Sequence, residues 1–468
     1  MNILKDSKDT IAAIATPIGE GGISVIRVSG ERAFSIVDHL FHGNKKIVDC
    51  ISHTIHFGTI IDPSSMETID TVLVSIFRNP HSFTGEDIVE ISSHGGYFLS
   101  QKILALLLST GARPAEPGEF SLRAFMNAKF DLTQAEAIAD IIHAKTEKAH
   151  KASVEQLEGK LSSYVQNIRT EILSVCSLLE LELDFSQEGI ELVDKSNVAV
   201  KLDTVINIIK KLTDSFYEGK LVRDGVRVAL IGRPNSGKSS LLNILLEEER
   251  AIVSEVPGTT RDVIEESILI DGIEFIFSDT AGLRKAFDKI EQEGIRRTAI
   301  ISERSDIILL LVDSSQVLSK TDSNIHQEIL ETFINKKPIL IAINKLDIKH
   351  SEFSLPINDF PKNSQFVGLS CISHLGISRL KKALFELTVP KHDSTASSVT
   401  ITNVRHRDAL EKALSALLAA RESINKGLSG DFIAVDLHLA LDYLGEIIGL
   451  TTPDDILNNI FSKFCIGK

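Results

Sequence analysis

The chain has 468 residues, 43% of them hydrophobic and 24% charged, and because domains usually contain about 100–200 residues it is expected to form several folding units. This composition is close to that of soluble globular proteins and excludes wholesale disorder. The net charge of −14 is opposite in sign to that of a protein that holds nucleic acid by phosphate neutralisation, so any RNA contact must be local or shared with a partner.

The cysteines and the apolar runs indicate the compartment. Cys50, Cys176, Cys371 and Cys465 form neither a CxxC metal pair nor a dense disulfide pattern, which favours reduced thiols in a cytosol. The N-terminus lacks the apolar core of a signal peptide. The apolar run at 307–313 is far shorter than the roughly 20 residues that cross a bilayer, so we expect a cytoplasmic protein without membrane contact.

An α+β domain is expected over residues 1–120. Short β-rich runs alternate there with turn clusters and two helical patterns. The strands are expected at 11–17, 23–28, 71–77 and 87–92, and the helices at 31–41 and 97–108.

Helical periodicity begins at residue 121 and continues to 221. Apolar residues recur at helical spacing with few Gly or Pro between them, which predicts long packed helices that carry no chemistry of their own. These residues are Leu157, Leu161, Ile168, Ile172, Val175, Leu179 and Leu183. The periodicity returns within 386–468, after a polar linker.

Residues 222–385 alternate strands with helices, as in a doubly wound α/β domain. The strands are expected at 226–232, 274–279, 307–313, 338–344 and 366–370. The predicted fold class is therefore multidomain α/β, with an N-terminal α+β domain, a discontinuous α-helical domain and an inserted doubly wound domain with a phosphate loop.

That phosphate-binding loop, GRPNSGKS at 232–239, follows an apolar strand directly and precedes a helix. Its glycines let backbone N–H groups turn inward around phosphates, and the helix N-terminus adds positive potential. Lys238 is expected to reach the terminal phosphates, and Ser239 to hold Mg²⁺ through its hydroxyl. The predicted nucleotide-binding residues of this loop are Asn235, Ser236, Gly237, Lys238, Ser239 and Ser240.

Two further segments, PGTTRD and DTAG, match the switch regions of a nucleotide hydrolase. Thr260 is expected to provide the second hydroxyl that binds Mg²⁺. The Asp279 carboxylate is expected to contact the ligands of the metal without binding the metal itself, and Gly282 to donate its backbone N–H to the γ-phosphate. The nucleotide-binding residues predicted here are Ser254, Glu255, Val256, Pro257, Gly258, Thr259, Thr260, Asp279, Thr280, Ala281 and Gly282.

The NKLD motif follows another strand and predicts guanine recognition. The Asp347 carboxylate can accept two hydrogen bonds from the guanine edge, where adenine has no matching donors. Two charge-assisted bonds of ~1.5–3 kcal/mol each imply at least about hundredfold selection for GTP over ATP. Asn344 and Lys345 belong to the same motif, and Ser370 and Cys371 fit the remaining base-contact loop.

Hydrolysis requires a group that positions water and one that neutralises charge in the transition state. Leu283 follows DTAG where a glutamine would position water, so that group must lie elsewhere. Asp288, Glu291 and Glu293 are candidates, spacing alone does not choose among them, and the alternative for each is a solvated surface charge.

Together, GRPNSGKSSLLN, SEVPGTTRD, DTAGLR and the terminal FCIGK resemble the bacterial tRNA modification GTPase family MnmE, also called TrmE. The resemblance extends to ATPIGEGGISVIRVSG, SFTGEDIVEISSHGG and AEPGEFSLRAFMNAKFDLTQAEAIADII, and so covers nearly the whole chain. It implies an N-terminal domain that binds a tetrahydrofolate one-carbon donor and forms a homodimer, and a helical domain that carries an inserted GTPase domain.

By this resemblance, the folate contacts correspond to Arg27, Glu86, Lys129 and Lys468. From the residues alone, Arg27 would be an edge-strand charge and Glu86 part of a turn.

The resemblance also implies that a potassium ion replaces an arginine finger in this GTPase. Asn235, Ser254, Val256 and Thr259 correspond to its ligands, and such a cation would neutralise the developing charge. Ser254 stands where the family often has threonine. The family's water-orienting glutamate corresponds to Glu291.

The C-terminal segment TTPDDILNNIFSKFC predicts a helix with a threonine cap, Pro453 at the first helical position and Cys465 at its end. The CIGK terminus is a poor prenylation box, because Gly467 and Lys468 do not suit one and no polybasic stretch precedes it. In isolation, Cys465 would be an incidental thiol at a frayed end. The resemblance implies instead that it is required for tRNA modification, as a nucleophile on uracil or through an adduct with the carbon donor.

The implied function is GTP-dependent modification of the tRNA wobble uridine with the FAD-binding partner MnmG, which adds a carboxymethylaminomethyl or aminomethyl group. The expected cofactors are Mg²⁺, K⁺ and 5,10-methylenetetrahydrofolate, with GTP as substrate, and the partners are a second copy, MnmG and tRNA. The alternative is a GTP-dependent ribosome-assembly or signalling switch, which would share every nucleotide motif but need no carbon donor.

Overall fold

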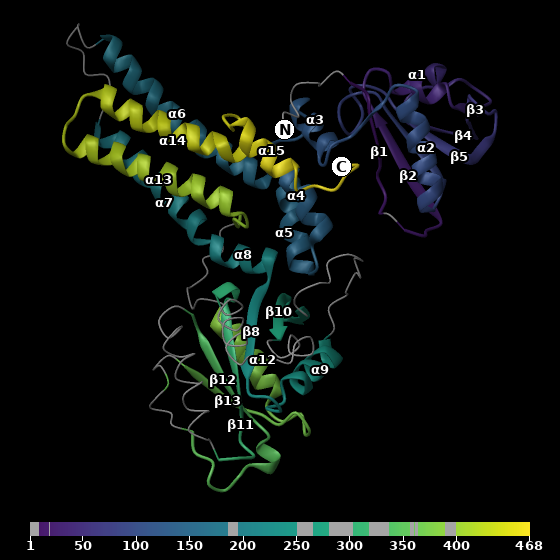
Figure 1. The fold of residues 1–468 in the computed structure, drawn as a ribbon. Helices are drawn as coiled ribbons and strands as arrows, with labels where there is room; N and C mark the ends of the chain where they lie inside the picture. The colour runs from purple at the N-terminus through teal and green to yellow at the C-terminus, as the bar shows by residue number, and fades with distance from the viewer. Residues whose placement is uncertain are drawn as a thin grey trace. The chain divides into compact units, whose positions relative to one another are not determined.

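The computed structural model of this chain describes residues 9–17, 19–185, 195–249, 265–279, 303–317, 337–355, 360, 364–388 and 399–468. Two compact units make up the chain (Figure 1). The first comprises Met1–Ala139, Glu155–Ile206 and Ala409–Lys468, and the second Asp140–Val154 and Asn207–Asp408. The predicted domain boundaries at 120, 221 and 385 stay predictions.

A seven-stranded sheet forms the N-terminal part of the first unit, in the order β3-β4-β5-β6-β2-β1-β7. All neighbouring strands are antiparallel except β1 and β7. The strands are β1 (Ile11–Ile14), β2 (Ile23–Ser29), β3 (Phe41–Gly43), β4 (Thr54–Ile61), β5 (Thr68–Phe77), β6 (Ile88–His94) and β7 (Arg113–Pro114).

Helices α1 (Ala33–Asp38) and α2 (Tyr97–Ser109) pack on one face of this sheet. Because successive side chains of a strand point to opposite faces, Val72 and Val74 enter the core beneath the helices while Leu73 faces away. The predicted α+β character of this region is confirmed, although α1 is shorter than the helix expected at 31–41.

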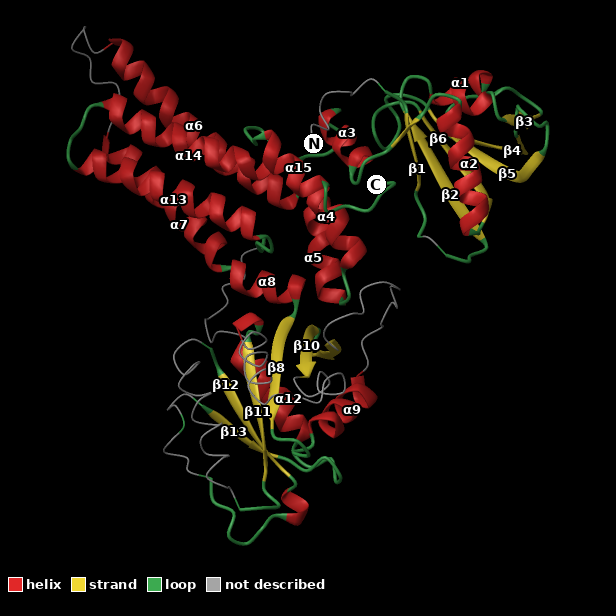
Figure 2. Cartoon of the chain, in the orientation of Figure 1, coloured by secondary structure: helices red, strands yellow, loops and turns green. Residues whose placement is uncertain are grey.

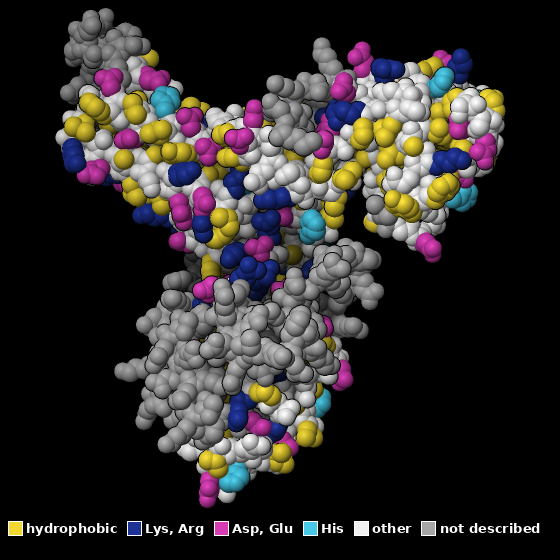
Figure 3. All heavy atoms as spheres, viewed as in Figure 1, with side chains coloured by type: hydrophobic (Ala, Val, Ile, Leu, Met, Phe, Trp, Pro, Cys, Tyr) yellow, Lys and Arg dark blue, Asp and Glu magenta, His cyan; other side chains and the backbone are white. Residues whose placement is uncertain are grey.

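The helical part of the first unit includes α3 (Glu119–Met126), α6 (Lys160–Phe185), α14 (Gly430–Ile448) and α15 (Asp454–Phe461), and α6 packs along α14 (Figures 1 and 2). Most of the predicted stripe is buried in α6, at Leu161, Ile168, Ile172, Val175 and Leu179. The side chain of Leu183 lies outside the described residues. Exposed hydrophobic side chains also gather on the outer part of this pair (Figure 3).

The predicted C-terminal helix is present, but three details were wrong. Pro453, not a threonine, is the N-cap of α15, with extended backbone, and the first helical residue is Asp454. The helix ends at Phe461, so Cys465 lies beyond it, because Phe461 and Phe464 turn into the core formed with Leu122 of α3.

The second unit contains a six-stranded sheet in the order β13-β12-β11-β8-β10-β9. All neighbours are parallel except β9 and β10. The strands are β8 (Val226–Gly232), β9 (Glu265–Ile270), β10 (Ile273–Asp279), β11 (Ile307–Asp313), β12 (Ile339–Asn344) and β13 (Gln365–Gly368). The five predicted strands are present, and β9 is additional.

Helices α9 (Lys238–Glu249) and α12 (Ile377–Thr388) share a core with one face of this sheet, and Phe353 and Phe360 cover the other. Strand β8 has β10 on one side and β11 on the other, so the chain changes direction across the sheet at this strand. Ligands bind at such a point, beyond the carboxyl ends of the strands.

The segments that precede and follow the α/β part of the second unit meet at one place. The chain enters through α8 (Phe216–Asp224), and the backbone N–H of Ile401 donates to Ser215 Oγ over 3.1 Å. A Cβ on Gly219 would lie 2.2 Å from the Ile401 carbonyl oxygen, so only glycine permits this close crossing.

In the described part of the chain, the unit boundaries fall within α4 (Leu132–His143), α5 (Glu147–Leu157), α7 (Lys195–Asp214) and α13 (Val404–Asn425). Within the second unit, Lys145 pairs with Glu274 at 2.9 Å, and Lys148 Nζ donates to the Asp271 carbonyl at 2.7 Å. The β9–β10 hairpin is thereby fixed to the segment that begins α5.

Candidate functional site

The loop between β8 and α9 requires its glycines. Gly237 has a φ of 102°, and a Cβ there would lie 2.3 Å from the Asn344 side-chain nitrogen. A Cβ on Gly232 would lie 2.6 Å from the Leu311 carbonyl oxygen. Asn235 adopts the left-handed conformation, with a φ of 64°. The loop therefore wraps closely against β11 and the end of β12, and no larger residue fits at the two glycines.

Lys238 begins α9, and its side chain is folded into the loop. Nζ donates to the carbonyl oxygens of Gly232 at 2.7 Å and Arg233 at 2.8 Å. The ammonium is buried inside the loop that would surround a phosphate, while Ser239 and Ser240 are exposed on the first turn of α9. This arrangement is suited to an anionic ligand at a helix N-terminus.

Asn344 joins this loop to the predicted base-contact loops. Its Nδ2 donates to the Ser236 carbonyl at 2.8 Å, and its Oδ1 accepts from the N–H groups of Lys345 at 2.8 Å and Cys371 at 3.3 Å. Asn344 is 1% exposed. One buried amide therefore connects the ends of β8, β12 and β13, and burial raises the pKa of the nearby Cys371 thiol.

The Asp347 carboxylate is exposed beside these loops and accepts a hydrogen bond from Ser370 Oγ at 2.5 Å. Lys345 has a φ of 65°, and its Nζ pairs with Asp313 at 2.6 Å. Burial opposes ionisation of Asp313, but its bonds with Lys345 and Ser315 outweigh it and lower its pKa. Asp313 was not predicted, although it ends its strand as Asn344 ends β12.

The structure thus brings together the phosphate loop, the NKLD residues and the pair Ser370 and Cys371. The side chains of Lys238 and Lys345 are held by bonds within these loops. Asp279 ends β10, but its side chain is outside the described residues. So are Ser254, Glu255, Val256, Pro257, Gly258, Thr259, Thr260, Thr280, Ala281, Gly282, Leu283, Asp288, Glu291 and Glu293.

A second site surrounds Arg27 in the N-terminal sheet. Its guanidinium pairs with Glu90 across β2 and β6 at 2.8 Å and lies 5.2 Å from the centre of the Phe83 ring. Its Nη1 also donates to the Gly467 carbonyl at 3.3 Å. Burial and the Arg27 charge lower the pKa of the Lys468 ammonium. The C-terminal tail therefore reaches Arg27.

Gly467 makes this tail contact possible. Its φ is 92°, and a Cβ there would lie 2.6 Å from the Ile14 carbonyl oxygen. The tail can therefore pass over β1 only with glycine at this position, and Cys465 remains exposed two residues earlier.

Glu86 and Lys129 lie beside the same sheet. Glu86 accepts hydrogen bonds from Ser29 Oγ at 2.8 Å and from Arg123 at 3.1 Å. Ser29 is two residues beyond Arg27 on β2, so both side chains leave the same face. Lys129 Nζ donates to the Pro80 carbonyl at 2.8 Å. It lines a shallow pocket of about 380 Å³ with His53, Phe77, His81, Ser82 and Phe83.

Sequence reasoning missed Glu90, Phe83 and Arg123. The partnership of Arg27 with Glu90 follows from the register of β2 and β6, which is not visible in the sequence. In the described part of the chain, no group of three or more His, Cys, Asp or Glu residues could hold a metal, and no helix there is long and apolar enough to span a membrane.

The largely parallel sheet, the phosphate loop at its change of direction and the NKLD loop beside it define a GTPase of the P-loop class. Family models described as the MnmE helical domain and the GTP-binding protein TrmE N-terminus match residues 132–465 and 10–129. The chain belongs to the MnmE family of tRNA modification GTPases, which confirms the resemblance drawn from the sequence.

Curated relatives match along nearly their whole length. The tRNA modification GTPase MnmE of Christiangramia forsetii is 43% identical, covering 98% of this chain and 99% of its own. That of Carboxydothermus hydrogenoformans is 41% identical, covering 98% and 100%.

Solved structures match over a smaller part. The G domain of the T. maritima FeoB iron transporter is 26% identical and covers 35% of this chain and 99% of its own, with a TM-score of 0.26. Aquifex aeolicus Era bound to GDP.AlF4- is 26% identical and covers 42% and 67%, with a TM-score of 0.27.

Proposed function

We propose that this protein couples GTP hydrolysis to modification of the tRNA wobble uridine, acting with MnmG and a tetrahydrofolate one-carbon donor. The observation that carries the proposal is the contact of Arg27 with the Gly467 carbonyl, which brings the tail that contains Cys465 and Lys468 to one of the predicted folate residues. A thiol near a carbon donor serves group transfer. The alternative, a GTP-dependent switch without modification chemistry, would not require the C-terminal tail to contact Arg27.

In the GTPase site, Lys238 would contact the phosphates and Asp347 the guanine edge. Mg²⁺ would be held by Ser239 and Thr260, and K⁺ by Asn235, Ser254, Val256 and Thr259. The exposed position of Ser239 on the first turn of α9, one residue after Lys238, fits a metal at the phosphates. When bound, the cations would neutralise charge that develops on the phosphates. Glu291 would orient the attacking water.

In the N-terminal site, Glu86, Lys129, Arg27 and Lys468 would bind the folate. The side chain of Arg27 is oriented by Glu90 and the Phe83 ring before any ligand arrives. A preorganised cation of this kind loses little freedom when it binds an anionic group. The Lys468 ammonium, with its lowered pKa, releases a proton more readily than an ordinary lysine.

Homodimer formation through the N-terminal sheet is part of the proposal. The face of the sheet opposite α1 and α2 exposes Ile55, Phe57 and Leu73, at 67%, 71% and 47%. Phe57 and Leu73 are cross-strand partners, so they form one apolar patch. Soluble monomers rarely expose such groups of large apolar side chains together, and a self-complementary interface would bury them.

The decisive experiment is mass analysis of wobble nucleosides from cells that lack this gene. Loss of the carboxymethylaminomethyl or aminomethyl group is expected, and unchanged nucleosides would overturn the proposal. Calorimetric titration with 5-formyltetrahydrofolate distinguishes the two candidate functions, since absence of binding favours the switch.

Because the chain is acidic, MnmG is expected to supply most of the tRNA-binding surface.

A further inference from the structure

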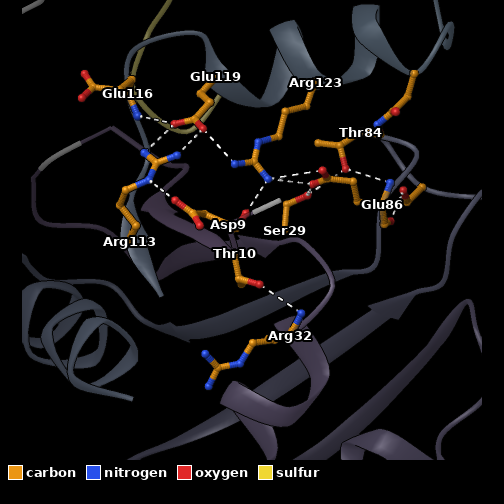
Figure 4. Close-up of polar contacts among 12 residues, drawn as sticks. Asp9, Thr10, Ser29, Arg32, Thr84, Glu86, Arg113, Glu116, Glu119 and Arg123 are labelled. Atoms are coloured by element: carbon orange, nitrogen blue, oxygen red, sulfur yellow. Dashed lines mark hydrogen bonds and ion pairs between the residues drawn. The ribbon is translucent and has the colours of Figure 1, made fainter. Parts of the chain in front are cut away.

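A row of alternating charges with a buried centre runs from β7 through α3 to Glu86 (Figure 4). Arg113 donates to both oxygens of Glu119, at 2.7 and 3.1 Å. Glu119 also accepts from Nη2 of Arg123 at 2.9 Å. Nη1 of Arg123 donates to Glu86, at 3.1 Å to Oε2 and 3.3 Å to Oε1. Glu86 is the end of the row.

The row is buried at its centre and exposed at both ends. The side chains of Arg123 and Glu119 are 6% and 2% exposed, whereas those of Glu86 and Arg113 at the two ends are 19% and 34% exposed. A ligand can therefore approach Glu86 and not the pair behind it. Because the guanidinium uses a different nitrogen for each carboxylate, its rigid plane fixes one carboxylate relative to the other.

The contacts also determine which oxygen of Glu86 is left for a ligand. Among the described residues, Oε2 accepts from both Ser29 at 2.8 Å and Arg123, while Oε1 has only the longer contact with Arg123. Each carboxylate oxygen can accept about two hydrogen bonds. Oε1 is thus the acceptor that remains for an incoming N–H donor.

We propose that Arg123, held in place by Glu119, is a positioning residue that orients Glu86 toward the pterin ring of the folate. This inference rests on the proposed folate function. The pterin ring presents an amino group and a ring N–H at one edge, which are donors of the kind that Oε1 accepts. Arg123 itself touches no ligand and acts through Glu86.

A merely structural role for Arg123 would be to tie α3 to the sheet, and Arg113 provides the matched control. Both arginines bond Glu119 and residue 9: Arg113 pairs with the Asp9 carboxylate at 3.4 Å, and Arg123 donates to the Asp9 carbonyl at 2.7 Å. Arg113 makes no contact with Glu86 among those that form the row. Because Arg113 is more exposed than Arg123, at 34% against 6%, thermal melting of both variants accompanies the binding measurement: a loss of packing alone would lower folate affinity in step with the loss of stability in each variant.

The test is calorimetric titration of the full chain with 5-formyltetrahydrofolate. Arg123→Gln is expected to weaken binding about tenfold or more, in keeping with a lost charge-assisted bond. Arg113→Gln is expected to change it less than about threefold, as for a residue outside the site. Equal losses in the two variants would overturn the proposal.

A double-mutant cycle with Glu86→Gln gives the second readout. Glutamine keeps one acceptor oxygen, so this background still binds, and Arg123→Gln is expected to cause no further loss in it. The same fold-loss in both backgrounds would overturn the proposal. If Arg123→Gln does not fold, as judged by thermal melting, Arg123→Lys replaces it in the same cycle. Failure of the wild-type chain to bind the folate would instead reject the proposed function and this inference with it.

Discussion

Replacement of Asn344 by alanine is expected to separate the phosphate loop from the base-contact loops. The variant loses the bond to the Ser236 carbonyl and the bonds from the N–H groups of Lys345 and Cys371. A buried hydrogen bond contributes about 0.5–1.5 kcal/mol net, so three contribute about 1.5–4.5 kcal/mol. Since about 1.4 kcal/mol is a factor of ten, affinity for guanine nucleotide should fall at least about tenfold.

Asn344→Asp is a sharper form of the same perturbation. It has almost the same shape but lacks the N–H donor, so an acceptor would face the buried Ser236 carbonyl. It should therefore bind more weakly than the alanine variant. Titration of the full chain with a fluorescent GDP analogue measures both, and thermal melting checks that the variants are folded. Wild-type affinity in either variant, or tighter binding by Asn344→Asp than by Asn344→Ala, would refute this reasoning.

Three other predictions follow from the two sites. GTP hydrolysis should be faster in K⁺ than in Na⁺, and Asn235→Ala should abolish the difference; equal rates for the wild type in the two salts would remove the role given to Asn235. Cys465→Ser should abolish wobble-uridine modification and leave GTP hydrolysis intact, whereas retained modification would show that the thiol is dispensable. Burial opposes ionisation of Glu119, but hydrogen bonds from Arg113 and Arg123 outweigh it and lower its pKa. Its stabilising contribution is therefore complete above the ordinary value of about 4.3 and is lost as pH falls through the lower folded value. The difference in melting temperature between wild type and Glu119→Gln should accordingly shrink as the pH falls below about 4, and a constant difference would contradict this.

The GTPase loops could be predicted from the sequence because each is a short contiguous segment with its own strand and helix signals. Gly237 and Lys238 lie where those signals indicate, between β8 and the start of α9, and Asn344 lies at the end of β12. Strand β9 was not predicted because EESILI begins with two acids and pairs with β10 alone, so it has little of the apolar pattern of a central parallel strand.

The N-terminal site was less accessible to such reasoning. In the sequence, Glu119 and Arg123 are an ordinary i,i+4 pair of the kind found on exposed helix faces. Their burial depends on Arg113 and on Glu86, which is 37 residues from Arg123 along the chain. Contacts between distant segments produce no periodic pattern in the sequence. The contact between Arg27 and Gly467 could not be predicted for the same reason.

The crossing at Ser215, Gly219 and Ile401 has a consequence for the history of this chain. An insertion whose two ends already touch need not spread the host segments apart, and its length adds little to the entropy of closing the loop. Domain insertion is tolerated where chain ends lie close together at a surface. An ancestral hydrolase could therefore have entered a helical protein as a cassette, and an engineer could take it out again by joining the segments at this crossing.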